Sequence, residues 1–77
     1  MITEEEIETI IRTAIPGAVA GAVDLTGTRD HWEVRVSCEG FRGKSLVEQH
    51  RMVNQALKAP LEDGRIHALA IKTKVPA

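Results

Sequence analysis

GFRGKSLVEQHRMV, residues 40–53, reads as a glycine turn followed by the start of an amphipathic helix. Ser45 and Glu48 have the spacing of a capping box, in which each side chain bonds the other residue's backbone N–H, so a helix is predicted to begin at Ser45. Residues at helical spacing then form one largely apolar stripe along this helix. The stripe comprises Leu46, His50, Val53 and Leu57 and is widened by Met52 and Ala56. Pro60 and the polar residues 62–64 are expected to end this helix.

The residues before this turn form the clearest strand in the sequence. Two sets alternate along it: the apolar Trp32, Val34, Val36 and Cys38, and the polar Glu33, Arg35, Ser37 and Glu39. This period of two predicts a strand with one buried face and one solvated face. Residues 18–26 are expected to form the strand before it, and the short turn at residues 27–30 would join the two as an antiparallel hairpin. A third strand is expected over residues 66–75.

A first helix precedes the hairpin. Thr3 and Glu6 form another capping box, and Pro16 stops the helix because the residue before a proline is pushed out of the helical region. The expected order is helix, strand, strand, helix, strand. A crossover through a helix makes the last two strands parallel if they share a sheet. The sequence therefore predicts an α+β fold: one small domain over residues 1–77, with a three-stranded mixed sheet and both helices on one face.

Composition narrows the class of function. The 77 residues carry a formal net charge of −1, whereas a dedicated nucleic-acid binder is usually basic. Cys38 is the single cysteine, so no disulfide forms within the chain, and no apolar run is long enough to span a bilayer. The N-terminus is acidic, unlike a targeting peptide. We expect a soluble, cytoplasmic chain. Since no nucleophile lies at a recognisable spacing from a base, we do not expect an enzyme.

Two histidines are candidate metal ligands. His31 begins the second strand and His67 begins the third, so parallel pairing of those strands would place both imidazoles at one end of the sheet. A solvated hairpin residue at His31 and a partly buried strand residue at His67 explain the same pattern without a metal. Side chains alternate between the two faces of a strand, so His67 would share a face with Leu69 and Ile71, which are expected to face the core. Only a bend or an early strand start would turn His67 outward. Two ligands do not close a metal site, so the others would come from a partner or cofactor.

Basic residues near the glycine turn form the other candidate site. Gly40-Phe41-Arg42-Gly43 is a literal GxxG, the loop by which KH domains clamp single-stranded nucleic acid, and it also fits a turn with Phe41 buried beneath it. Four side chains are candidates for a partner or nucleic-acid surface: Arg42, Lys44, His50 and Arg51. His50 lies on the apolar stripe, where a packed role is the alternative. Cys38 is in phase with the buried strand face, which favours a core residue over a thiol ligand.

Three segments together resemble the BolA family. They are Phe41-Arg42-Gly43-Lys44-Ser45, Gln49-His50-Arg51-Met52-Val53 and Ile66-His67-Ala68-Leu69-Ala70-Ile71-Lys72-Thr73. Asp30-His31-Trp32 also resembles that family's entry to its second strand. The resemblance covers nearly the whole chain. It implies a BolA-like domain over residues 1–77, with a fold similar to class II KH domains, in agreement with the expected order of elements.

The resemblance also implies a function. BolA-like proteins pair with monothiol glutaredoxins and share a [2Fe–2S] cluster, to which the glutaredoxin side contributes its cysteine and a glutathione thiolate. Carried over by motif, the ligands from this chain would be His67 and, near the hairpin turn, His31. Neutral imidazoles in place of thiolates on one iron raise the reduction potential, as in Rieske centres. The implied role is a non-enzymatic adaptor of iron–sulfur trafficking or iron regulation. A KH-like nucleic-acid-binding transcriptional regulator is the alternative, and a homodimer of the chain alone is left open.

Overall fold

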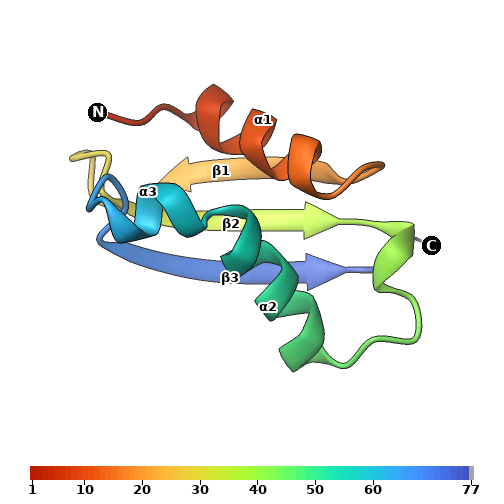
Figure 1. Ribbon diagram of the computed structural model, residues 1–77. Coiled ribbons are helices and arrows are strands. Elements are labelled where there is room, and N and C mark those ends of the chain that lie inside the picture. The colour runs from red at the N-terminus through yellow and green to blue at the C-terminus, as the bar shows by residue number, and fades with distance from the viewer. Residues whose placement is uncertain (77) are drawn as a thin grey trace.

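The computed structural model describes residues 1–76, which fold into a layer of helices on a layer of strands (Figure 1). In chain order the elements are α1 (Glu4–Ala14), β1 (Val19–Asp24), β2 (His31–Ser37), the 3₁₀ turn η1 (Glu39–Phe41), α2 (Leu46–Ala56), α3 (Lys58–Glu62) and β3 (Ala68–Lys74). No helix within these residues is long and apolar enough to cross a membrane.

The three strands form one mixed sheet in the order β1-β2-β3. β1 and β2 pair antiparallel, and β2 and β3 pair parallel, with His31 opposite Ala68 and Ser37 opposite Lys74. The helices lie on one face of the sheet, where α1 contacts β1 and α2 contacts β3 (Figure 1). The predicted α+β fold is therefore confirmed. The other face is open and exposes residues such as Val19 and Arg35.

The core lies between the sheet and the helices. β2 and the residue after it contribute the predicted alternating set, all of it buried: Trp32, Val34, Val36 and Cys38. The helices add Ile7, Ile11 and Val53 to the same cluster, which also includes Leu57 between α2 and α3. From β1 only the small residues Ala20 and Ala22 pack against this core, while Val19 and Val23 face solvent with 72% and 47% exposure. The short side chains on the inner face of β1 leave room for α1.

Both predicted capping boxes are present. The Glu6 N–H donates to Thr3 Oγ1 at 3.2 Å, and the Thr3 N–H donates to Glu6 Oε1 at 3.2 Å. At the start of α2, the Glu48 N–H donates to Ser45 Oγ at 3.2 Å and the Ser45 N–H to Glu48 Oε1 at 3.0 Å. Because α2 is the crossover helix, this second cap fixes where the chain turns back toward β3.

The glycine turn before α2 closes one end of the core. Phe41 is fully buried, and Gly43 has a φ of +81°, a left-handed conformation that side chains rarely adopt. Phe41 therefore packs beneath the turn, the second of the two readings that the sequence allowed for the GxxG segment.

Two features differ from the sequence expectation. The chain continues past α2 into α3, with Pro60 as its third residue; proline is tolerated there because N–H groups of a first turn have no acceptor within the helix. Leu46, expected on the inward stripe, is 61% exposed because the first turn of α2 projects beyond the edge strand β3 (Figure 1). Of the other stripe residues, Val53 and Leu57 are buried and His50 is half-buried.

Phe41→Ala is expected to destabilise the domain by about 3–5 kcal/mol, because it removes a fully buried ring and leaves a cavity under the turn. Urea unfolding followed by Trp32 fluorescence measures the change. Val47→Ala is the matched control, since Val47 is 60% exposed and surface substitutions shift stability by about 0.5 kcal/mol or less. A loss for Phe41→Ala as small as that of the control would show that the ring does not support the core.

Acid is expected to weaken the cap of α2. Hydrogen bonds from the Ser45 backbone N–H and then its hydroxyl hold the pKa of Glu48 below its ordinary value. The stabilisation is therefore complete above the unfolded-state pKa of about 4.3 and is lost as the pH falls through the lower folded-state pKa. Glu48→Gln keeps the cap geometry but cannot titrate.

Urea unfolding between about pH 5 and pH 3 tests this pH dependence. The free energy of unfolding should fall more steeply for the unmodified chain than for Glu48→Gln, because the other carboxylates titrate equally in both. Parallel pH curves for the two proteins would contradict a role for the Glu48 charge in the cap.

Candidate functional site

Asp24 organises the hairpin loop between β1 and β2. Its carboxylate accepts the backbone N–H of Arg29 at 3.2 Å, and Arg29 has the left-handed φ of +59°. The Arg29 guanidinium lies 2.6 Å from Glu4 Oε1 on α1, and the Arg29 carbonyl accepts the Trp32 indole N–H at 3.1 Å. The loop is thus tied to both layers of the fold, and it holds Asp30 at the entry to β2.

The backbone of Asp30 joins this loop to the start of β3. The Asp30 carbonyl accepts hydrogen bonds from the N–H groups of His67 at 2.7 Å and Ala68 at 3.2 Å. Figure 1 shows the hairpin loop beside the segment that leads into β3. The parallel register places His31 opposite Ala68. The prediction that His31 and His67 meet at one end of the sheet is therefore confirmed.

The two imidazoles lie edge to face, with ring centroids 6.4 Å apart and ring planes at 83°. Their side chains are partly open to solvent, 43% for His31 and 60% for His67. His67 turns outward because β3 begins only at Ala68, so the period-two phase of Leu69 does not extend back to it. His67 is thus a solvent-facing residue and not a core residue.

Asp30 lies between the imidazoles, and the sequence analysis did not include it among the site residues. Asp30 Oδ1 is 3.0 Å from His31 Nδ1, and Oδ2 is 3.2 Å from His67 Nδ1. The Thr28 hydroxyl donates to the same carboxylate; this bond, and then the contact with His31, lowers the pKa of Asp30, so the group is an anion at neutral pH. The sequence offered only one indication that Asp30 belongs to the site, namely that it directly precedes His31. Its contact with His67 arises only from the register of β2 against β3.

The histidine pair can supply two nitrogen ligands to one metal ion. Two imidazoles on one tetrahedral ion have ring centroids about 5 Å apart, given metal–nitrogen bonds of about 2.0–2.1 Å. The observed separation of 6.4 Å is longer than this, so the two partly exposed rings would have to move toward each other to share an ion. Within residues 1–76, no group of three or more His, Cys, Asp or Glu side chains is arranged to hold a metal ion. The donors are compatible with the histidine half of a [2Fe–2S] site shared with a partner.

Cys38 does not join this pair. It follows the last residue of β2, at the opposite end of that strand from His31, and is 3% exposed. Its backbone N–H donates to the Lys74 carbonyl at 3.2 Å. Cys38 is a core residue, as its strand phase predicted.

The residues predicted for a partner or nucleic-acid surface lie away from the histidine pair. Arg42 follows η1 beyond the far end of β2 and is paired with Glu39. Lys44 is exposed in the turn, and His50 is half-buried in α2. Arg51 borders a shallow hollow formed by the end of α1 and by α2. The structure therefore separates this set from the candidate ligands.

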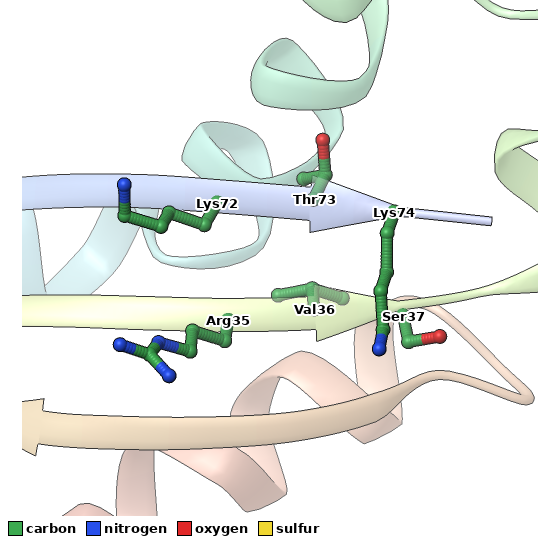
Figure 2. Close-up of a pocket in the computed structure, with 6 residues that line it drawn as sticks. All are labelled: Arg35, Val36, Ser37, Lys72, Thr73 and Lys74. Carbon is green, nitrogen blue, oxygen red and sulfur yellow. The ribbon is translucent and has the colours of Figure 1, made fainter. Parts of the chain in front are cut away.

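A shallow basic groove lies at the carboxyl ends of β2 and β3. Its volume is ≈ 210 Å³, and it is lined by Arg35, Val36, Ser37, Lys72, Thr73 and Lys74. Figure 2 shows the Lys74 side chain lying across from β3 toward Ser37 on β2. The Arg35 guanidinium is paired with Glu33 at 2.8 Å. Positive charge thus gathers at the end of the sheet opposite the histidines, a feature that the sequence analysis did not identify.

Known proteins resemble this chain over most of its length. A sequence model of the family described as BolA-like protein matches residues 9–77. Protein BOLA2 of Arabidopsis thaliana is 38% identical over 73 residues, which cover 94% of this chain and 76% of that protein.

Solved structures show the same similarity in three dimensions. BolA1 from Arabidopsis thaliana matches with a TM-score of 0.84 and 25% identity, over 99% of this chain and 95% of that one. The BolA domain of SufE1 from Arabidopsis thaliana matches with a TM-score of 0.81 and 26% identity, over 95% and 91%. With a family match over most of its residues and a relative at 38% identity, this chain belongs to the BolA-like protein family.

Proposed function

We propose that this chain is an adaptor that binds a monothiol glutaredoxin and shares a [2Fe–2S] cluster with it, in iron–sulfur trafficking or iron regulation. The observation that carries the proposal is the meeting of His31 and His67 at one solvent-facing end of the sheet, with both Nδ1 atoms toward Asp30. Membership of the BolA-like family supports it, because resemblance to that family implies this partner.

The chemistry of the pair suits a shared site. Each iron of a [2Fe–2S] cluster takes two ligands from outside the cluster, so His31 and His67 would fill one iron. A partner cysteine and a glutathione thiolate would fill the other. When bound, the cluster would supply one-electron chemistry or a transferable iron–sulfur unit. This chain's own contribution is to hold two neutral nitrogen donors where a partner can reach them.

We propose binding and not catalysis as the role of the site. Family membership supports an adaptor or regulator, and the histidine pair has the exposure of a docking site. The nucleic-acid alternative has less support. The aromatic residue of the GxxG segment, Phe41, is buried, and Arg42 is paired with Glu39.

A partner that reaches both histidines must approach the end of the sheet where the hairpin loop meets the start of β3 (Figure 1). The hairpin loop and residues 63–67 would border that contact. Arg42, Lys44, His50 and Arg51 lie toward the other end, so they would contact only a partner that also covers α2. Their role in partner binding stays a prediction.

His67→Ala is expected to abolish or greatly weaken the signal of the shared cluster, because it removes one of the two proposed nitrogen ligands. The measurement is visible absorption and circular dichroism of the chain mixed with a cluster-loaded monothiol glutaredoxin. Arg12→Ala is the control, since Arg12 is exposed on α1 and belongs neither to the histidine pair nor to the candidate partner surface, so it should leave the spectra as they are. An unchanged spectrum for His67→Ala would show that His67 is not a ligand.

His31→Cys tests the second proposed ligand. A thiolate donates more charge to iron than an imidazole does, so the reduction potential of the shared cluster should become more negative. Protein-film voltammetry of the purified heterodimer measures the shift. Arg12→Cys places the same thiol on α1, away from the pair and from the candidate partner surface, and should not change the potential. Equal potentials for His31→Cys and the unmodified chain would remove His31 from the ligand set.

A further inference from the structure

The outer edge of β3 is open. β3 lies at one side of the sheet and pairs only with β2. The Cys38 N–H, directly after β2, donates to the Lys74 carbonyl at 3.2 Å, so the even-numbered residues of β3 turn their backbone groups toward β2. The residues whose N–H and C=O groups point away from the sheet are therefore Leu69, Ile71 and Thr73. An edge of this kind can pair with another extended chain.

The edge of β1, on the other side of the sheet, is covered at its middle. The backbone of Ala22 points away from β2 there, and Glu8 on α1 fills the position, because its Oε2 accepts the Ala22 N–H at 3.2 Å. Natural sheets commonly protect their edges with charges or covering elements. In the part of the chain that the structure describes, no side chain covers the outward N–H groups of β3 in this way. Gln49 of α2 bonds the Thr73 hydroxyl instead, at 2.6 Å.

The first turn of α2 extends past this open edge (Figure 1). Two apolar side chains of that turn are exposed, Leu46 at 61% and Val47 at 60%. On the same face of the sheet, Leu69 and Ile71 are only partly buried. A helix in a two-layer fold buries its apolar surface against a neighbouring element. The position that a fourth strand would take beside β3 therefore has a free backbone edge and an apolar helix surface next to it.

The opposite face of β3 is basic. Lys72 and Lys74 are exposed on the face away from the helices and, with Arg35, line the shallow groove (Figure 2). A strand placed beside β3 would thus meet apolar side chains on one face of the sheet and two ammonium groups on the other. Successive side chains of a strand point to opposite faces, and opposite charges on neighbouring strands attract. The segment that fits this position alternates apolar and acidic residues.

A second copy of this chain fits the edge poorly. The antiparallel register that uses the whole of β3 is centred on Ile71, since Ala68 then lies opposite Lys74. That register makes the Lys72 side chains of the two copies diagonal neighbours on one face. Diagonal neighbours are within reach of long side chains, and like charges there disfavour the pairing. Charge therefore favours an acidic partner segment over self-association.

We propose that the outer edge of β3 is a docking site for an extended segment of a partner protein, in which acidic residues alternate with apolar ones. The segment adds a fourth strand to the sheet, and its main chain bonds the outward backbone groups of Leu69, Ile71 and Thr73. Its acidic side chains face Lys72 and Lys74, and its apolar side chains lie on the α2 side. The inference uses neither histidine and does not depend on a shared cluster.

The probe is a peptide of seven alternating valine and glutamate residues, matched to the seven residues of β3 and blocked at both ends. The measurement is isotope-filtered NOE spectroscopy of the labelled, isolated chain with unlabelled peptide. The N–H protons of Leu69, Ile71 and Thr73 should show contacts to peptide backbone protons, whereas those of Ala70 and Lys72, which face β2, should not. Absence of binding, or peptide contacts at β1 instead of β3, would overturn the proposal.

Two N-methylated forms of the same peptide test main-chain pairing without any change to the protein. One form is methylated at alternate residues, and the other at the remaining residues. The form whose methyl groups face β3 should lose binding, and the form whose methyl groups face solvent should keep it. Equal binding of both forms would show that no strand is added.

Exposed side chains carry the specificity test. Lys72→Glu combined with Lys74→Glu should weaken binding of the valine–glutamate peptide about 10-fold, and a valine–lysine peptide should bind this double variant more tightly than the unmodified chain. Leu46→Ser should also weaken binding, whereas Val19→Ser, at an exposed position on the outer face of β1, should not. Unchanged affinity in the double variant would overturn the choice of an acidic segment.

Two further outcomes would replace the proposed occupant. If a serine–glutamate peptide or a single-stranded oligonucleotide binds as tightly as the valine–glutamate peptide, the lysines form a general polyanion site and the proposal is wrong. If sedimentation shows that the isolated chain forms a dimer, and Lys72→Glu changes its dissociation constant, a second copy occupies the edge and the proposal is equally wrong.

Discussion

The parallel pairing of β2 with β3 is the contact on which the candidate site depends. It sets His31 opposite Ala68, and the Asp30 carbonyl extends the pairing by accepting the N–H groups of His67 and Ala68. These residues are distant in sequence, so their pairing carries the entropy cost of closing the crossover between them, which contacts of the crossover with the core must offset. The crossover is held to the core by three buried side chains, Phe41, Val53 and Leu57. The capping box of Ser45 and Glu48 stabilises the start of α2. The site is thus a product of the whole core and not of one loop.

Local signals in the sequence predicted most of the fold. The two capping boxes, the alternation along β2 and the proline after α1 each act within a few residues, and each is present as expected. Where the outcome depended on the surroundings, the sequence was less informative. The exposure of Leu46 follows from how far α2 extends past β3, and Pro60 is compatible with α3 because it falls in the first turn.

The candidate site was predicted in part for the same reason. His31 and His67 were identified because each was expected to begin a strand, and parallel strands bring their starts together; in the structure His31 begins β2 and His67 directly precedes β3. Asp30 was missed because its second contact, to His67 Nδ1, exists only in the folded register. The basic groove is a comparable case, since Arg35 comes from β2 whereas Lys72 and Lys74 come from β3 (Figure 2). Contacts between side chains on two distant strands cannot be predicted from the local sequence of either strand alone.

The hairpin loop bears on how a partner would find the histidines. A flexible loop would have to order His31 at the moment of association, and that lost freedom would weaken binding. Here the Asp24 carboxylate, the ion pair between Arg29 and Glu4, and the Trp32 indole hold the loop before any partner arrives. The Asp30 contacts extend the same order to the rings. The two imidazoles, whose side chains are 43% and 60% exposed, are then the part of this end of the sheet that is left free to adjust to a partner.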